Sequence, residues 1–365
     1  MVMAMIKLSP LNQRRWQNFK NNRRALWSLW IFMALFITSL FAELIANDRP
    51  LLVKYQGEYY TPFLQFYPET TFGGDLSIEA VYDDPAVACL IRSGGNLECW
   101  DAPDATPDHA TQPGWMLWAP IPYSYDTTND LGGRAAPTPP DAQHWLGTDD
   151  TTRDVLARII YGFRLSIMFT LIVTAVSSVI GIIAGAAMGY FGGWVDLVFQ
   201  RFLEIFGAVP TLYVIIIMVA IMGRSFTLLV VLSIFFGWPA LTGLVRAEFL
   251  RARNFEYVRA AQALGVSNWT VMMRHILPNA MVATLTMLPF LVTGAIGSLA
   301  TLDFLGFGLP SASASLGEIT QQAKHNIQTP HLGISAFLTF TIMLSLLVFI
   351  FEGVRDAFDP RKVFQ

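Results

Sequence analysis

The stretch Asn254–Asn279, NFEYVRAAQALGVSNWTVMMRHILPN, is a polar and basic interruption in the otherwise apolar second half of this 365-residue chain. Asn254 is a potential cap for a helix that begins at the next residue. Gly265 is expected to end that helix, because glycine adopts positive φ without steric cost. Ser267 can cap a second helix, which Pro278 is expected to stop. The stretch therefore predicts two short helices joined by a glycine elbow.

The first of these helices predicts a docking face. Four of its residues recur at i, i+3, i+4 and i+7, which is the spacing of one apolar stripe on a helix. They are Tyr257, Ala260, Ala261 and Leu264. The two central alanines would let another surface approach closely, and arginines surround the stripe. An ordinary helical hairpin is the alternative interpretation.

The same residues resemble the signature loop of the permease subunits of binding-protein-dependent ABC importers. The resemblance lies in Ala260-Ala261, Gly265 and Ile276-Leu277-Pro278. In that family the loop is a coupling helix that docks into a groove on an ATPase subunit. The family usually has Glu where this chain has Arg259, although the oligopeptide and dipeptide branch often departs from Glu there. The resemblance implies a coupling role for Tyr257, Arg259, Ala260, Ala261, Leu264, Gly265 and Pro278.

The composition is that of a membrane protein, with 53% hydrophobic and 14% charged residues. The net charge of −3 hides a strong asymmetry along the chain. No stretch matches a phosphate-binding loop or a dinucleotide fingerprint, so no cofactor is expected here. ATP and Mg²⁺ would bind to partner subunits. The histidines lack ligand spacing, so no metal site is expected either.

The N-terminal part predicts a cytoplasmic segment, residues 1–24, followed by a first transmembrane helix, residues 25–46. Six basic residues and no acid precede the apolar run, and basic residues favour the cytoplasmic side. About 20 apolar residues span a bilayer. A cleaved signal peptide is the alternative, but the run is longer than the usual signal-peptide core of about 7–15 residues.

Residues 47–150 are rich in proline, glycine, aspartate and aromatic residues. Helix parity places them outside the cytoplasm, in the periplasm of a Gram-negative cell. Clustered aromatics predict a folded insert of α/β or β-containing structure. Cys89 and Cys99 flank the turn signal Ser93-Gly94-Gly95-Asn96, which predicts a hairpin closed by a disulfide, with two free thiols as the alternative.

Residues 151–365 predict a core permease domain of five further spans, at 165–190, 202–222, 226–245, 281–302 and 332–351, with a cytoplasmic coupling loop at 246–279. Small residues recur every four positions in the first of these spans and predict close helix packing. They are Ser177, Gly181, Gly185 and Gly189. The fold class is thus an all-α membrane protein with six transmembrane helices, of the type I ABC importer permease fold by resemblance.

The segment before the second span contains Gly147-Thr148-Asp149 and Arg153-Asp154-Val155-Leu156, which are similar to the start of the core in peptide-importer permeases. Its apolar residues would lie along the membrane surface, with Arg153 and Arg158 facing water. Residues 8–56 are similar to the second permease subunit of microcin-C-type peptide importers.

A second external loop begins with Asp303-Phe304-Leu305-Gly306-Phe307-Gly308. Family members carry a similar Phe-Leu-Gly-x-Gly where the loop meets the solute-binding protein, which implies an outer gate and receptor-docking site. The alternative is a purely structural turn. The residues concerned are Asp303, Phe304, Leu305, Gly306 and Gly308.

The spans hold almost no ionisable residues at their centres, whereas ion-coupled transporters need them to bind the driving ion. Energy would therefore enter through the coupling loop. Proline interrupts three successive spans at Pro210, Pro239 and Pro289, which suits a reshaping pathway but is also common in membrane helices. A membrane enzyme would need a cluster of His, Asp or Ser at one depth, and a receptor would need a cytoplasmic output domain. The sequence suggests neither.

The resemblance implies a multi-pass inner-membrane permease of an ATP-driven peptide importer, with both termini in the cytoplasm. Its expected partners are a second permease subunit, two ATP-binding subunits or one fused ATPase chain, a periplasmic peptide-binding protein and membrane lipid, but no nucleic acid.

Overall fold

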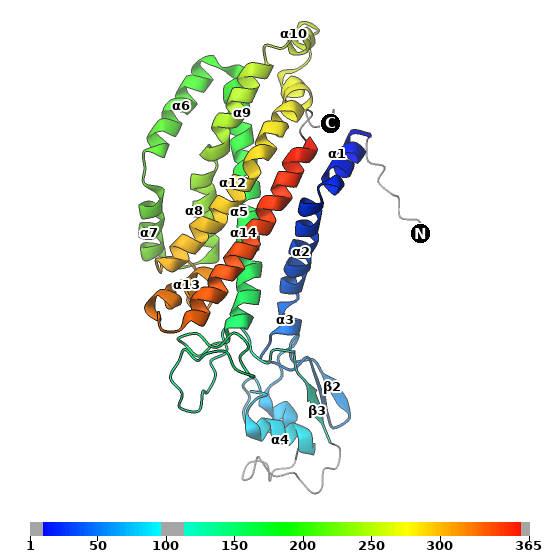
Figure 1. The fold of residues 1–365 in the computed structure, drawn as a ribbon, viewed down its shortest axis with the longest axis vertical. Coiled ribbons are helices and arrows are strands. Elements are labelled where there is room, and N and C mark those ends of the chain that lie inside the picture. The colour runs from blue at the N-terminus through cyan, green and yellow to red at the C-terminus, as the bar shows by residue number, and fades with distance from the viewer. Residues whose placement is uncertain (1–9, 96–112, 359–365) are drawn as a thin grey trace.

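The computed structural model describes residues 10–95 and 113–358, which form a bundle of long helices with a small sheet-containing unit at one end (Figure 1). Among these residues, five helical segments are long and apolar enough to cross a membrane, and one bent pair supplies a sixth. The predicted six-helix, all-α membrane fold is therefore confirmed. The five segments are α2 (Arg23–Leu40), α5 (Val155–Phe191), α8 with α9 (Phe226–Gly237 and Pro239–Ala252), the segment ending in α12 (Leu277–Phe304), and α14 (Pro330–Phe358).

The first span packs along the last. Helix α1 (Pro10–Asn21) precedes α2, and the Asn22 side chain caps α2 by accepting a hydrogen bond from the Ala25 N–H at 3.2 Å. A short helix α3 (Ala42–Ile45) follows α2. Phe19 and Ala25 are buried, and a Cβ atom on Gly353 of α14 would lie 2.2 Å from the Cβ of Ala25. Glycine at that position therefore lets α2 and α14 touch.

The third span was predicted at residues 202–222, with an interruption at Pro210. It consists of α6 (Gly193–Gly207) and α7 (Thr211–Met222), which meet at an angle of 68°. Pro210 lies at the break, and proline supplies no N–H to continue the helix. The span therefore starts earlier than predicted and is bent.

The glycine stripe of α5 lies against α9, as the four-residue spacing predicted. A Cβ atom added to Gly185 would lie 2.6 Å from the carbonyl oxygen of Thr242, and one on Gly189 would lie 2.5 Å from the Cβ of Phe249. No residue larger than glycine fits at these positions without moving α9. The backbones of α5 and α9 are thus in direct contact over several turns.

The insert between the first and second spans contains a three-stranded antiparallel sheet in the order β2-β1-β3. Its strands are β1 (Leu52–Tyr55), β2 (Glu58–Tyr60) and β3 (Trp115–Leu117), with Val53 opposite both Tyr60 and Met116. The short helix η1 (Glu69–Phe72) and the helix α4 (Pro85–Ser93) pack against the sheet around the buried Phe72 ring. The predicted strand-containing insert is confirmed.

The sequence predicted a hairpin around Cys89. In the structure Cys89 instead lies in the helix α4, where it is buried. Asp84 caps this helix and Pro85 starts it, so local helix signals outweigh the turn signal that follows. That turn ends the helix, because Gly94 has a φ of 75°. Cys99 lies outside the described residues, so the disulfide between Cys89 and Cys99 stays a prediction.

Pro278 does not stop a helix, contrary to the prediction. Helix α11 (Asn268–Thr270), the π-helical turn η3 (Val271–Ile276) and α12 run on as one helical segment. The Leu277 N–H donates to the carbonyl of Met272, five residues back. Pro278 follows this wider turn and sits in the first turn of α12, where a missing N–H is tolerated.

The two predicted functional loops lie at opposite ends of the bundle. Helix α10 (Glu256–Ala263) is at the end of the molecule that also holds α1 and the C-terminal part of α14, whereas α13 (Leu316–His325) and the insert are at the other end (Figure 1).

We expect Gly185→Leu to destabilise the folded permease by about 1–3 kcal/mol, since the side chain would have to push α9 away. The measurement is thermal unfolding of the purified protein in detergent. Gly243→Leu is the matched control, because a Cβ atom at Gly243 has no neighbour within 4 Å. Equal stability of the two variants would contradict the proposed contact.

Candidate functional site

The coupling-loop candidate begins with a helix that starts one residue later than predicted. Phe255, not Asn254, is the N-cap residue of α10, and its side chain makes no capping hydrogen bond. The Asn254 side chain instead donates to the Leu250 carbonyl at 3.1 Å, so it closes the end of α9. Asn254 does cap a helix, but it caps the C-terminal end of α9 and not the start of α10.

Gly265 occupies the elbow as predicted, with a φ of 79°. Its N–H donates to the Gln262 carbonyl at 3.0 Å, and the Val266 N–H donates to the Ala261 carbonyl at 3.1 Å. This pair of bonds is a Schellman motif, which needs a left-handed residue just past the helix end. A Cβ atom at Gly265 would meet nothing within 4 Å, so only the backbone conformation selects glycine.

The predicted apolar stripe of α10 is divided between two environments. Leu264 is 83% exposed and Tyr257 is 43% exposed, and Ala260 is also exposed. Ala261, in contrast, is buried together with Val258 in the chain's own core. The prediction of a single outward face is therefore wrong for Ala261, because the helix needs one side to pack on the rest of the permease.

The outward side of the loop is apolar with exposed cations. Besides Leu264 and Tyr257, the exposed apolar residues include Trp269, 67% exposed, and Phe255, 40% exposed. Arg259 is also exposed. Exposed apolar side chains grouped on one loop are typical of a protein-binding surface.

Polar contacts fasten the inner side of the loop to the end of α5. The Tyr190 hydroxyl donates to the Asn268 side chain at 2.8 Å and accepts from the Gln262 side chain at 3.1 Å. One tyrosine thus holds both α10 and α11. At the loop's far end, the Asn279 side chain donates to the Tyr257 hydroxyl at 3.1 Å.

Charged contacts fix α9, which leads into the loop. Arg246 pairs with Asp196 of α6 through two hydrogen bonds, the longer of them 2.6 Å. Arg253 donates to the carbonyls of Gly189 and Tyr190 at 3.3 and 3.4 Å, where the C-terminal end of α5 leaves acceptors free. These contacts tie α9, and with it the start of the loop, to α5 and α6.

At the opposite end, Arg158 is fully buried, although the sequence predicted that it faces water. The prediction failed because α5 begins at Val155 and carries Arg158 on its inner side, rather than forming a separate helix on the membrane surface. The guanidinium contacts the Asp149 carboxylate directly and donates to Glu318 of α13 at 2.7 Å. The local sequence did not predict these partners, which lie 9 and 160 positions away.

The two carboxylates around Arg158 differ in their titration. Burial alone would raise the pKa of Asp149, but the Arg158 charge and hydrogen bonds from the Arg153 N–H and Thr151 bring it below its usual value. Burial raises the pKa of Glu318 above its usual value, and the Arg158 charge offsets this only in part. Asp149 is thus the firmly ionised partner of Arg158.

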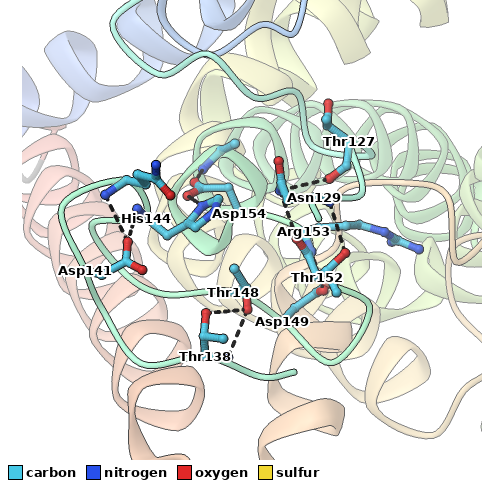
Figure 2. A network of polar contacts seen from close by, with 12 residues as sticks. Thr127, Asn129, Thr138, Asp141, His144, Thr148, Asp149, Thr152, Arg153 and Asp154 are labelled. Atoms are coloured by element: carbon cyan, nitrogen blue, oxygen red, sulfur yellow. Dashed lines mark hydrogen bonds and ion pairs between the residues drawn. The ribbon is translucent and has the colours of Figure 1, made fainter. Parts of the chain in front are cut away.

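A collar of residues 127–154 surrounds the start of α5, as Figure 2 shows. Asp154 caps α5 by accepting from the Ala157 N–H at 2.8 Å, and its other oxygen lies 2.9 Å from His144 Nδ1. The hydroxyls of Thr138 and Thr148 are 2.9 Å apart (Figure 2). These side-chain bonds give a segment with little regular secondary structure a defined shape.

The external loop folds around a buried carboxylate. Asp303 accepts hydrogen bonds from the Leu309 N–H and from the Ser315 hydroxyl, both at 2.7 Å. Gly306 has a φ of 81°, and Gly308 packs so tightly on Asp303 that a Cβ atom would overlap the carboxylate. Asp303 and the two glycines therefore have a structural role, and Leu305, 42% exposed, is available for contacts.

Comparison with known proteins identifies the family. Residues 177–363 match the family model of the binding-protein-dependent transport system inner membrane component. The chain belongs to this family. Residues 9–67 match the N-terminal transmembrane domain of oligopeptide transport permease C.

Two curated relatives are similar along nearly the whole chain. The inner membrane ABC transporter permease protein YejE of Escherichia coli is 52% identical over 98% of this chain and 99% of its own length. The peptidoglycan transport system permease protein YejE of Agrobacterium fabrum is 50% identical over 98% and 95%. The oligopeptide transport system permease protein OppC of Bacillus subtilis is 34% identical over 66% and 78%. This family member is a multi-pass membrane protein.

We expect Asp149→Asn to destabilise the permease by about 1.5–3 kcal/mol at neutral pH, as loss of a hydrogen-bonded charge does. Because its pKa is lowered, the Asp149 charge stabilises the fold at any pH above its unfolded-state pKa. Glu318→Gln should cost much less, because the raised pKa means that burial already disfavours the Glu318 charge. Thermal unfolding of the two variants in detergent compares them, and equal losses or the reverse order would refute the assignment.

Proposed function

We infer that this chain is a permease subunit of an ATP-driven peptide importer and that residues 254–279 couple it to ATPase subunits. The observation that carries the proposal is the outward apolar surface of α10, held on a loop that is fastened to α5 and α9. Relatives named as oligopeptide and dipeptide permeases support the substrate class.

The loop is suited to transmit motion. A partner that moves the exposed Leu264 would move α10. Because Val258 and Ala261 of α10 pack in the core, the core would move with this helix. Tyr190 and Arg253 would pass that movement to α5. ATP-driven closure of two ATPase subunits, or of one fused ATPase chain, would then reshape the bundle. The ATP-hydrolysing sites would lie in those partners.

A second, related permease subunit would complete the pathway, and a peptide-binding protein would deliver the substrate at the opposite end. The candidate docking surface there is the Asp303–Gly308 turn, where Leu305 is exposed and the Phe304 ring contacts Lys324 of α13. The buried Asp303 would keep this turn in shape while the receptor binds and leaves. The insert would stand next to it, outside the cytoplasm.

The basic segment before α2 favours a cytoplasmic position for α1. Helix α10, at the same end of the bundle, would then also be cytoplasmic, and the insert would lie outside. We expect fusions at Gly94 and Ser313 to give activity with a reporter that works only outside the cytoplasm. Fusions at Gly265 should give activity with a reporter that works only inside. A cytoplasmic Ser313 would refute both the six-span topology and the receptor-docking role of the loop.

The coupling role is tested most directly by Leu264→Glu. The side chain is 83% exposed, so the variant should fold and insert normally. In the docking groove, however, an unpaired charge would lose its water, which is unfavourable. Peptide uptake and the stimulation of ATP hydrolysis by loaded receptor should therefore fall to near background.

Two further variants serve as a control and as an independent disruption of the loop. Arg259→Glu places the same charge on the exposed side of the same helix and should keep most of the coupling. Gly265→Val should reduce coupling, because a β-branched residue at a φ of 79° costs about 1–3 kcal/mol. Full ATP-dependent uptake by normally inserted Leu264→Glu permease would refute the docking role.

A further inference from the structure

A cavity of about 340 Å³ lies inside the bundle, between α5, α7, α8, α9 and α12. Its opening is on α12, where Phe290 is 68% exposed and Gly294 and Ser298 are exposed. Hydroxyl side chains from four helices line it. They are Thr174, Ser177, Ser178, Thr211, Ser233 and Ser298.

Three of these hydroxyls have no partner among the residues that the structure describes. Thr174, Ser177 and Ser178 of α5 are at least nine-tenths buried, and within the described part of the chain their oxygens make no hydrogen bond. An unsatisfied hydroxyl in a membrane interior is unfavourable. A group that hydrogen-bonds to them is therefore expected to enter the cavity.

Among the described residues, Thr170 of α5 also makes no hydrogen bond but does not line the cavity, whereas threonines of α9 and α12 behave differently. The hydroxyl of Thr284 donates to the Ala280 carbonyl at 3.3 Å, and that of Thr301 donates to the Gly297 carbonyl at 2.7 Å, each four residues back on α12. Thr242 of α9 bonds in the same way. Helical hydroxyls usually satisfy themselves like this. On α5, three residues within one turn and a half instead leave their hydroxyls free for something in the cavity.

The chemistry of the lining defines the ligand. No Asp, Glu, Lys, Arg or His is among the described residues that form the cavity, so it offers nothing to a charged terminus or side chain. A hydroxyl can rotate to donate to a carbonyl or to accept from an N–H. A peptide backbone presents both groups in alternation, whatever its sequence.

We propose that the Thr174–Ser177–Ser178 cluster is a transient binding site for the backbone amides of a peptide in transit, with uncharged side chains resting on the apolar wall formed in part by Phe169 and Ile215. This inference rests on the proposed peptide import. The site accepts uncharged peptides of many sequences, because it recognises the backbone.

The test uses the complete importer, reconstituted in liposomes with its receptor and ATPase subunits, and radiolabelled peptides of two to eight uncharged residues. The variant Thr174→Val/Ser177→Ala/Ser178→Ala removes hydroxyls that have no protein partner, so folding should be unaffected. We expect peptide transported per ATP hydrolysed to fall about tenfold, as loss of a few hydrogen bonds would produce. ATP hydrolysis stimulated by loaded receptor should change less than twofold.

Thr284→Val is the matched control, since Thr284 is equally buried but bonded to its own helix and outside the cavity. Its transport per ATP should equal that of the parent. A parent-like ratio in the triple variant would overturn the proposal and leave peptide import standing. Failure of the parent to transport any of these peptides would instead overturn the proposed function, and the inference with it.

A second variant fills the cavity from the other side. A Cβ atom at Gly294 has no neighbour within 4 Å, so Gly294→Leu can be accommodated by the fold and would occupy the space in front of the hydroxyls. It should reduce transport per ATP at least as strongly as the triple variant. Undiminished transport by an importer carrying Gly294→Leu would show that the cavity holds lipid or a partner's side chain instead of peptide.

Discussion

The direct backbone contact between α5 and α9 is the constraint on which the other features depend. Helix α5 has 37 residues and is therefore about 55 Å long, enough to reach from the collar to the coupling loop. At its glycines there is no space for a side chain between α5 and α9. Because α9 leads into α10, the coupling loop inherits its position from this contact. The hydroxyl-lined cavity is on the same helix.

The two ends of α5 are held by different forces. At the collar, a fully buried guanidinium contacts two carboxylates, and without them its charge would have no compensation. At the loop, Tyr190 makes neutral hydrogen bonds, and the charged Arg253 donates to neutral carbonyls at 3.3 and 3.4 Å, without a carboxylate. Neutral bonds cost less to rearrange than buried ion pairs. The loop end is therefore the easier one to move when a partner pulls on it.

Features of the fold and of the site that depend on local sequence could be predicted. Features that depend on contacts between distant segments could not. Positive φ at Gly265 follows from the glycine itself, and the small-residue repeat of α5 needed only helical spacing. The burial of Arg158 depends on Glu318, 160 residues away, and could not be inferred from an amphipathic pattern. Ala261 faces inward because the core needs it beside Val258, whereas a periodicity shows that a stripe exists but not which partner each residue meets. Pro278 was predicted to end a helix, because the sequence gives no signal for the π-helical turn that precedes it.

The start and the end of the insert's excursion meet in space. Ala46 and Ile121 form a bridge, with the Asn47 N–H donating to the Ile121 carbonyl and the Ile121 N–H donating to that of Ile45. The Tyr161 hydroxyl of α5 then holds the Ala46 carbonyl at 2.9 Å. A segment whose ends already touch can be lengthened, shortened or exchanged without pulling on the scaffold that carries it. Evolution could therefore vary this part of the surface, and with it whatever binds there, while the transport machinery stayed unchanged.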